Sequence, residues 1–474
     1  MCDNARVSTL LVFASLFPAR PQPACPVKIS YRFPASFRWG VAAAAPQIEG
    51  AATTDGKGES IWDRFAAQPG RVIRGDTPAV ACDHYRRFEK DFALMRELGI
   101  RNYRFSFAWP RIYPDGGATL NPRGLAFYHR LVDAMLRHDI APFATFYHWD
   151  LPQALEDAGG WRVRATAEAF ARYADTLVRE FGDRVKHWIT LNEIPTFIGH
   201  GYRSGIHAPG ATESARVVNQ AFHHTLLAHG HAVRAVREHG GRAARVGLTQ
   251  DMGGAIPVIE TDAHIAAAQA ELAERNEHIL GPIFHGRYPP SYLRRAGPDR
   301  PVWARGDLEL ISQPTDFLGL NIYTGYFVRA LARKRREVLD YPEGHPRAAL
   351  SWLILAPQAI YWAIRHCHEL YGPKAIYITE NGAGYDEPST VSGDFADIHR
   401  RDYVRNYLLN VHRAVAEGYP CRGYFLWSFM DNFEWAEGYS KRFGIVHVDY
   451  ATQKRTPKLS ARWYAEVIRH NRLV

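Results

Sequence analysis

The stretch Ala375-Ile376-Tyr377-Ile378-Thr379-Glu380-Asn381-Gly382 is typical of a buried β-strand that stops at a carboxylate, an amide and a glycine. A second stretch, Val185-Lys186-His187-Trp188-Ile189-Thr190-Leu191-Asn192-Glu193, follows the same pattern. Each stretch therefore predicts a strand that carries a glutamate at its carboxyl end. Either one alone is weak, because many strands end in a glutamate that only caps a neighbouring helix.

Strand-like and helix-like segments alternate around these two stretches, from about Phe33 to the C-terminus. The predicted strands cover residues 37–42, 100–106, 140–148, 185–193, 245–250, 316–323, 375–380 and 421–429. The predicted helices cover residues 83–98, 125–138, 165–181, 215–239, 263–280, 357–371 and 401–417. Alternation predicts a parallel sheet, and eight strands predict a closed (β/α)8 barrel of the α/β class with its active site at the carboxyl ends of the strands. We expect Gly281-Pro282 to end the helix over 263–280.

Composition and charge are those of an ordinary soluble globular protein. The 474 residues are 46% hydrophobic and 23% charged, which supplies a large core without requiring a second domain. The formal net charge is +9, but the basic residues are scattered apart from Arg333-Lys334-Arg335-Arg336, which we interpret as a solvated loop. No nucleic-acid-binding motif accompanies that run, so nucleic acid is not an expected partner.

Five widely spaced cysteines, an odd number without a Cys-x-x-Cys pair, indicate neither a disulfide framework nor a zinc site. They fit a reducing compartment, so we predict a cytoplasmic location.

The N-terminal residues 1–30 include an apolar run from Val7 to Phe17, which is a weak secretory signal, a disordered extension or the product of a mis-assigned start codon. We expect a dispensable extension over 1–30, a single catalytic barrel over 31–474, and no membrane-spanning segment elsewhere.

Two glutamates on separate strand ends suit the hydrolysis of a glycosidic bond, in which one carboxyl protonates the leaving oxygen and the other attacks the anomeric carbon. In a retaining enzyme the two carboxyls lie about 5 Å apart, so one must stay ionised while its neighbour holds a proton. Arg104, on the second predicted strand, is the candidate cation beside Glu380, and Tyr323 is a candidate hydrogen-bond donor to it. Glu193 is then the acid/base. The alternative is that both glutamates are structural.

Other polar and aromatic residues gather at the predicted strand ends. Gln47, His148, Asn192, Glu434 and the indole N–H groups of Trp149 and Trp435 can bond sugar hydroxyls, and Trp427 can face a sugar ring. Five histidines lie on one predicted helix, at positions 223, 224, 229, 231 and 239. No two of them are four residues apart, as a helical His-x-x-x-His metal site requires, so we interpret them as surface residues and predict no metal and no cofactor.

Both glutamates and most of the polar and aromatic residues at the strand ends belong to six ordered motifs. From about Phe33 to the C-terminus these motifs resemble glycoside hydrolase family 1, the retaining β-glucosidases. The motifs are Phe37-Arg38-Trp39-Gly40 with Gln47-Ile48-Glu49-Gly50-Ala51, Tyr103-Arg104-Phe105-Ser106, His148-Trp149-Asp150-Leu151-Pro152, Thr190-Leu191-Asn192-Glu193, Ile378-Thr379-Glu380-Asn381-Gly382 and Trp427-Ser428-Phe429-Met430-Asp431-Asn432-Phe433-Glu434-Trp435.

The resemblance implies a role for each matching residue. Glu380 is the implied nucleophile and Glu193 the implied acid/base of a double displacement. The residues implied to bind the glycone or to support the site are Gln47, His148, Asn192, Asn321, Trp427, Glu434, Trp435, Phe443, Arg104 and Tyr323. Trp352 is implied to contact the aglycone.

Five positions depart from the family pattern. Ala45-Pro46 replaces a Ser-Tyr or Thr-Tyr pair, Ile194 stands where proline usually follows the acid/base, Ile322 replaces a tyrosine, and Leu353 replaces a glutamate after Trp352. The catalytic pair is intact, but the aglycone side is expected to be less polar.

The resemblance thus implies a β-glucosidase acting on terminal β-D-glucosyl residues of β-glucosides or cello-oligosaccharides, with side activity on β-galactosides and β-fucosides. Glu434 is expected to repel a phosphate, which favours unphosphorylated substrates, and Glu193 favours O-glycosides. Two alternatives are an enzyme that transfers the sugar to an acceptor other than water and a non-catalytic sugar-binding barrel. The sequence predicts no oligomeric state.

Overall fold

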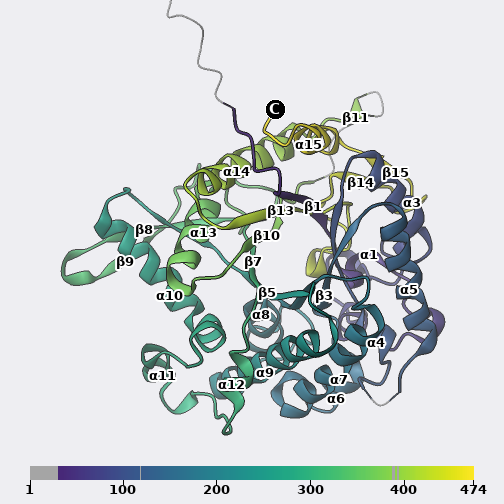
Figure 1. The fold of residues 1–474 in the computed structure, drawn as a ribbon, viewed down its shortest axis with the longest axis horizontal. Helices are drawn as coiled ribbons and strands as arrows, with labels where there is room; N and C mark the ends of the chain where they lie inside the picture. The colour runs from purple at the N-terminus through teal and green to yellow at the C-terminus, as the bar shows by residue number, and fades with distance from the viewer. Residues whose placement is uncertain (1–29, 118, 387–389, 392–393) are drawn as a thin grey trace, which may run out of the picture.

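The computed structural model describes residues 30–117, 119–386, 390–391 and 394–474, so the predicted extension over 1–30 lies outside the described residues except for Ser30. Eight parallel strands close into a barrel in the order β1-β13-β10-β7-β5-β4-β3-β2 (Figure 1). They are β1 (Arg38–Ala42), β2 (Asn102–Ser106), β3 (Ala141–Tyr147), β4 (His187–Asn192), β5 (Arg245–Asp251), β7 (Phe317–Asn321), β10 (Ile376–Asn381) and β13 (Cys421–Trp427). The predicted (β/α)8 barrel is confirmed.

The long helices surround the barrel, as Figure 1 shows. They are α3 (His84–Glu97), α5 (Pro122–Arg137), α7 (Arg164–Phe181), α9 (Ala215–His239), α10 (Asp262–His285), α13 (Gln358–Tyr371), α14 (Ile398–Ala416) and α15 (Leu459–His470). Their apolar sides are buried against the strands, whose own side chains are almost all buried. Such burial on both faces is what a parallel barrel requires.

The expected end of α10 at Gly281-Pro282 is wrong, because the helix continues to His285. Proline removes one helical hydrogen bond at a cost of about 3 kcal/mol, but Ile279, Leu280 and Ile283 around it are buried in the core. The helix instead ends where Gly286 adopts a left-handed φ of 64°. Tertiary packing therefore overrides the local stop signal.

The interpretation of the histidines of α9 as surface residues is wrong for three of them, because His223, His224 and His229 are buried. Each imidazole has a polar partner: His223 contacts Asp307 at 3.1 Å, and His229 contacts the Thr190 hydroxyl at 2.7 Å. The helix packs against α7, β4 and β5, so its inward face includes these positions. Among the described residues, no group of three or more His, Cys, Asp and Glu side chains could hold a metal ion.

A second small sheet, which the sequence did not predict, joins β6 (Gly254–Pro257), β8 (Gly325–Ala330) and β9 (Arg336–Leu339). The basic run lies in the turn between β8 and β9, where the side chains of residues 333–335 are exposed as expected. Arg336 differs, since it begins β9 and pairs with Glu271 at 2.7 Å.

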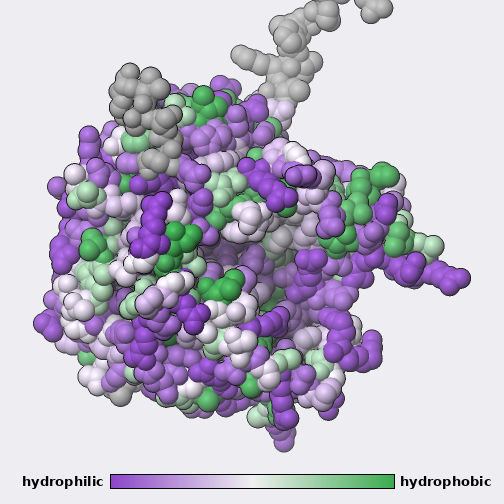
Figure 2. Space-filling view, turned by 180° about the vertical axis from the view of Figure 1, so that it is seen from behind, coloured by the Kyte–Doolittle hydropathy of each residue, from purple (hydrophilic) through white to green (hydrophobic). Residues whose placement is uncertain are grey.

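Figure 2 shows that hydrophilic residues cover most of one face of the molecule, with apolar residues in small scattered groups.

Two further observations bear on the sequence predictions. In the described part of the chain, no helix is both long enough and apolar enough to cross a membrane. Of the cysteines that the structure describes, Cys82, Cys367 and Cys421 are all buried and free of disulfide bonds.

Candidate active site

A cavity of about 470 Å³ opens at the carboxyl ends of the barrel strands. Eleven of the residues that the sequence predicted for the site line it: His148, Trp149, Asn192, Glu193, Tyr323, Trp352, Glu380, Trp427, Glu434, Trp435 and Phe443. The other three, Gln47, Arg104 and Asn321, lie behind this wall and bond to residues that line it. Residues that are far apart in the sequence therefore meet in one cavity, because the carboxyl ends of all eight strands share one face.

Glu380 lies at the end of β10 and is only 3% exposed. The Arg104 guanidinium donates from Nη1 to its Oε1, and the Tyr323 hydroxyl donates to its Oε2 at 2.6 Å. Arg104, on β2, is itself buried, so the ion pair is shielded from water. A fixed cation and a hydroxyl donor both stabilise the ionised form of the Glu380 carboxyl.

Glu193 directly follows β4 and adopts a left-handed φ of 54°. The Asn321 amide donates to its Oε1 at 2.6 Å. Burial raises the pKa of Glu193 well above its usual range, and the negative charges of Asp251 and Glu380 raise that pKa further. Of the described residues that line the cavity, none is a lysine or an arginine. The two glutamates thus have opposite environments, one favouring the ionised carboxylate and the other the protonated acid.

Asn192 connects the two halves of the site. Its Oδ1 accepts from Arg104 Nη2 at 2.6 Å and from Asn321 Nδ2 at 3.1 Å, while its Nδ2 lies 3.1 Å from His148 Nε2. Burial and the nearby Arg104 charge lower the pKa of His148 well below its usual range. His148 is therefore a neutral imidazole held in place by the Asn192 amide.

Trp149 and Gln47 form hydrogen bonds within the protein that bear on their predicted contacts with sugar hydroxyls. The Trp149 indole N–H already donates to the Asn192 carbonyl at 3.0 Å, so only its ring can contact a sugar. Gln47 is fully buried, and its Nε2 donates to the Phe433 carbonyl at 2.8 Å and to Glu434 at 3.3 Å. Gln47 therefore positions Glu434 from behind.

Glu434 has a different charge from the one that the sequence analysis assumed. Burial raises the pKa of Glu434 to about 8, although Asn432 and Gln47 donate hydrogen bonds to it. At neutral pH this carboxyl is mostly protonated, so it can donate to a sugar hydroxyl as well as accept from one. The expected repulsion of a phosphate by a Glu434 carboxylate is correspondingly weaker.

Asp251 and Thr196 line the cavity but were missed in the sequence analysis. Asp251 is the last residue of β5, whereas the predicted strand stopped one residue earlier, at Gln250. A carboxylate at a strand end is the signal that revealed Glu193 and Glu380, and it applies equally to Asp251. Thr196 lies on the short helix α8 (Ile194–Ile198), and no strand-end pattern marks it.

The mouth of the cavity is apolar. Trp352 is 51% exposed and meets the Tyr323 ring edge-on at 5.9 Å, and Ile206 is 53% exposed. Leu353 is fully buried and does not line the cavity, so the low polarity of this side comes from Trp352, Leu350 and Ile206 and not from Leu353 as the sequence implied.

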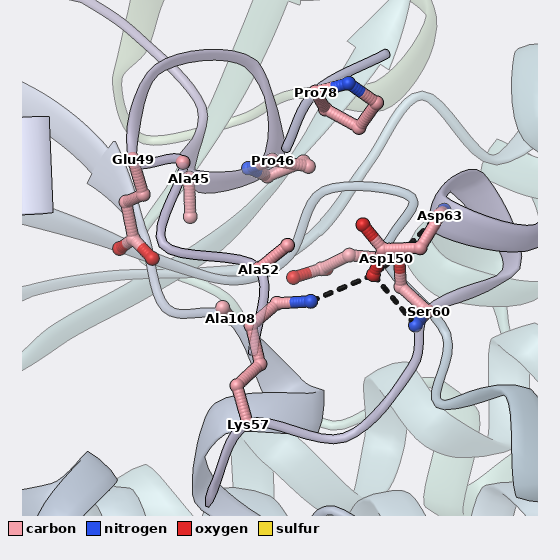
Figure 3. Close-up of a pocket in the computed structure, with 11 residues that line it drawn as sticks. Ala45, Pro46, Glu49, Ala52, Lys57, Ser60, Asp63, Pro78, Ala108 and Asp150 are labelled. Carbon is pink, nitrogen blue, oxygen red and sulfur yellow. Dashed lines mark hydrogen bonds and ion pairs between the residues drawn. The ribbon is translucent and has the colours of Figure 1, made fainter. Parts of the chain in front are cut away.

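A second, much smaller cavity lies beside the end of β3 (Figure 3). Asp150 lines it together with Lys57, Ser60 and Asp63, and Asp63 accepts from the Lys57 ammonium at 2.7 Å and from the Ser60 backbone N–H at 2.9 Å. Burial raises the pKa of Asp150 to about 7. The cavity volume is about 20 Å³, the size of one water molecule, which excludes a sugar.

Comparison with known proteins agrees with this geometry. A family model described as "Glycosyl hydrolase family 1" matches residues 29–473. "Beta-glucosidase A" from Thermotoga maritima is 44% identical over 445 residues, which cover 93% of this chain and 99% of the relative. "Beta-glucosidase 4" from Oryza sativa subsp. japonica is 42% identical over 459 residues, covering 92% and 95% of the two chains.

Solved structures are equally similar. "Family 1 b-glucosidase from Thermotoga maritima" superposes with a TM-score of 0.86 at 42% identity and covers 94% of this chain and 99% of that one. "Beta-glucosidase from Thermotoga maritima in complex with castanospermine" has the same TM-score and identity, with coverage of 94% and 100%.

Proposed function

This chain belongs to glycosyl hydrolase family 1, and from that membership we propose that it is a retaining β-glucosidase that releases terminal, non-reducing β-D-glucosyl residues. The observation that carries the proposal is the pair of glutamates in one cavity. Arg104 and Tyr323 are bonded to Glu380, whereas no cation among the described residues is bonded to Glu193. A retaining glycosidase needs this division between an ionised nucleophile and a protonated acid.

In the proposed reaction, Glu380 attacks the anomeric carbon while Glu193 gives its proton to the glycosidic oxygen, and the bond to the leaving group breaks. The product of this step is a glucosyl ester of Glu380. Glu193, now ionised, removes a proton from water, and the resulting attack on the anomeric carbon releases glucose with its β configuration. Arg104 and Tyr323 hold the Glu380 carboxylate in position and are not themselves consumed.

We expect the glucosyl ring to lie over Trp427, with His148, Asn192, Glu434 and Trp435 around its hydroxyls. Phe443 forms part of the same wall, and Trp149 contributes its ring. Asn321 and Gln47 act from behind, through Glu193 and Glu434 respectively.

The proposed substrates are unphosphorylated β-glucosides, including cello-oligosaccharides. Recognition of a phosphate normally uses arginine or lysine, and the described cavity lining contains neither. A relative from Thermotoga neapolitana, 44% identical over 93% of this chain, is named "1,4-beta-D-glucan glucohydrolase". Side activity on β-galactosides and β-fucosides, and a cytoplasmic location, remain predictions from the sequence.

Hydrolysis of p-nitrophenyl glycosides tests the proposal. The wild-type enzyme is expected to hydrolyse the β-glucoside, the β-galactoside and the β-fucoside, and to leave the α-glucoside and the 6-phospho-β-glucoside intact. Glu380→Ala should lower kcat by several orders of magnitude while circular dichroism shows an unchanged fold. A 2-deoxy-2-fluoro-β-glucoside should label Glu380 covalently, as peptide mass spectrometry can show. A folded wild-type enzyme that hydrolyses no β-glycoside would leave the sugar-binding barrel as the better interpretation.

A second candidate activity is transfer of the glucosyl group to an alcohol or sugar acceptor. The exposed apolar side chains of Trp352 and Ile206 at the cavity mouth favour it, because they can hold an acceptor where water would otherwise attack. Chromatography of the products formed with and without an added alkyl alcohol distinguishes the two. Alkyl glucoside in excess of free glucose would indicate transfer as the main activity.

A further inference from the structure

Thr196 and Asp251 face the cavity beside Glu193 but have no role in the reaction described above. The Thr196 hydroxyl donates to Asp251 Oδ2 at 3.0 Å. The same hydroxyl can donate to the Glu193 carboxyl instead, and such a bond lowers the pKa of Glu193. Thr196 is fixed there because its backbone N–H donates to the Glu193 carbonyl at 3.0 Å. Thr196 therefore lies between two carboxyl groups.

One hydroxyl carries one proton, so Thr196 can donate to only one of its two carboxyl neighbours at a time. While it donates to Asp251, its oxygen can only accept from Glu193, and Glu193 can donate only when it is protonated. The Asn321 amide already donates to Glu193 Oε1, which leaves Oε2 to carry the proton. One proton on Glu193 and a charge on Asp251 satisfy every partner in this chain of hydrogen bonds.

We propose that Asp251 is a positioning residue that acts through Thr196 to keep Glu193 protonated before glycosyl transfer and to strengthen it as a base afterwards. The inference rests on the proposed function. It adds Asp251 as a third carboxyl group that takes part in the reaction beside Glu193 and Glu380. In the first step the proton leaves Glu193 for the glycosidic oxygen, and the Glu380 charge is consumed in the glycosyl ester. The cavity thus holds two negative charges before the step, on Glu380 and Asp251, and two after it, on Glu193 and Asp251.

After the first step the Thr196 hydroxyl is free to turn from Asp251 to the newly ionised Glu193. The negative charge of Asp251 then opposes a second negative charge on Glu193, which favours removal of a proton from the attacking water. Asp251 therefore acts in the same direction in both steps: it makes the protonated form of Glu193 the more stable one.

The other charged and titratable groups around the cavity are Glu380, Glu434, Glu437, Tyr323, His148, His200 and His207. Arg104 lies below Glu380. Burial lowers the pKa of His200 and, to about 3, that of His207, so both imidazoles are neutral and neither offsets the Asp251 charge. Burial raises the pKa of Asp251 as well, with Glu380 adding to the effect and Thr196 opposing it. Burial apart, Asp251 raises the pKa of Glu193 more than Glu380 does.

The pH profile of kcat/KM tests the proposal, because its alkaline limb reports loss of the proton from the general acid in the free enzyme. An alkyl β-glucoside is the appropriate substrate, since a poor leaving group needs that proton. We expect Asp251→Asn to move the alkaline limb to lower pH by about one unit. The acidic limb, and the rate for a dinitrophenyl glucoside whose leaving group needs no proton, should change much less.

Thr196 variants provide the second arm of the test. Thr196→Val should lower the pH-independent maximum of kcat/KM for the alkyl β-glucoside, because the ionised Asp251 loses its donor and competes for the proton that Glu193 held. Thr196→Ser should keep the wild-type maximum. Asp183→Asn is the matched control, because Asp183 is 70% exposed and precedes β4 at the opposite end of the barrel. If Asp251→Asn fails to fold, the comparison of Thr196→Val with Thr196→Ser still tests the proposal.

The outcomes separate this inference from the proposed function. An alkaline limb that coincides with the wild-type limb in active Asp251→Asn, or an unchanged maximum of kcat/KM in folded Thr196→Val, would overturn the role of Asp251. Failure of the wild-type enzyme to hydrolyse any β-glucoside would instead overturn the proposed function itself.

Discussion

Arg104 is the residue on which the geometry of the proposed catalytic pair depends most directly. One guanidinium nitrogen donates to Glu380 and the other to Asn192, which in turn bonds Asn321, the residue that donates to Glu193. A guanidinium can hold two acceptors in a fixed geometry, whereas an ammonium group is a single point charge. Arg104 therefore sets the position of both glutamates while contacting only one.

Arg104→Lys is expected to lower kcat/KM for an aryl β-glucoside by about 10- to 100-fold, the usual effect of losing a partner that orients a catalytic group. The variant keeps a positive charge near Glu380 but loses the bond to Asn192. Steady-state kinetics, with thermal unfolding as a check on the fold, measure the effect. Arg111→Lys is the control, because it alters another buried arginine–glutamate pair, with Glu49 at 3.0 Å, that does not line the cavity. Equal losses in the two variants would show that the effect is one of stability alone.

At the scale of elements, the barrel strands were predictable because each is a short apolar run that ends in polar residues, and the helices between them are amphipathic. The predicted positions of Glu193 and Glu380 followed from those strand ends. Asp251 was missed because the predicted strand ended at Gln250, one residue before the carboxylate.

Tertiary packing accounts for what the sequence did not reveal. The end of α10 was misplaced because burial of Ile283 outweighs the cost of Pro282. The histidines of α9 look like surface residues in sequence, and only the packing of α9 against α7 and the barrel shows that three are buried. The bond from the Trp149 indole to the Asn192 carbonyl is likewise a contact between separate strand ends, which no local pattern reveals.

The buried imidazole of His229 should make the stability of the protein sensitive to acid. Burial lowers the pKa of His229 to about 3, well below the unfolded value of about 6.5. Between these values the unfolded chain binds the proton and the folded chain does not, so stability falls as the pH falls below about 6.5. From pH 8 to pH 5 this residue costs about 2 kcal/mol.

His229→Asn should therefore lose about 2 kcal/mol less stability than the wild-type protein between pH 8 and pH 5. The variant will be less stable at pH 8, because the smaller side chain leaves a gap beside Thr190. Urea unfolding of both proteins at the two pH values isolates the pH-dependent part. Parallel losses in the two proteins would show that His229 does not titrate on unfolding in this range.

At the scale of the whole molecule, the two ends of the described chain close the barrel together (Figure 1). Asn471, which follows α15, accepts a hydrogen bond from the Trp39 indole at 2.8 Å and donates to the Phe33 carbonyl at 2.8 Å. Its backbone carbonyl accepts from the Phe33 N–H at 3.0 Å. Trp39 lies on β1, so the C-terminal residues hold the first strand of the barrel in place.

Asn471→Gly tests this closure without straining the backbone, because glycine adopts the left-handed φ of 50° that Asn471 has here. We expect a loss of about 2 kcal/mol, the net value of two hydrogen bonds, measured as a lower Tm or urea midpoint. Asn471→Asp should lose less, because it keeps the acceptor for the Trp39 indole.

Removal of residues 1–29, in contrast, should leave the contacts between the two chain ends intact. The contacts that close the barrel begin at Tyr31, whose carbonyl accepts from the Leu473 N–H at 3.2 Å, and a chain that starts at Ser30 retains all of them. The shortened protein is therefore expected to keep the Tm and the kcat/KM of the full chain. A fall in Tm as large as that of Asn471→Gly would mean that the catalytic domain extends beyond residues 31–474. An unchanged Tm in the shortened protein and a lowered one in Asn471→Gly would place the N-terminal boundary of the domain between residues 29 and 33. There the chain before β1 first bonds to the residues that follow α15.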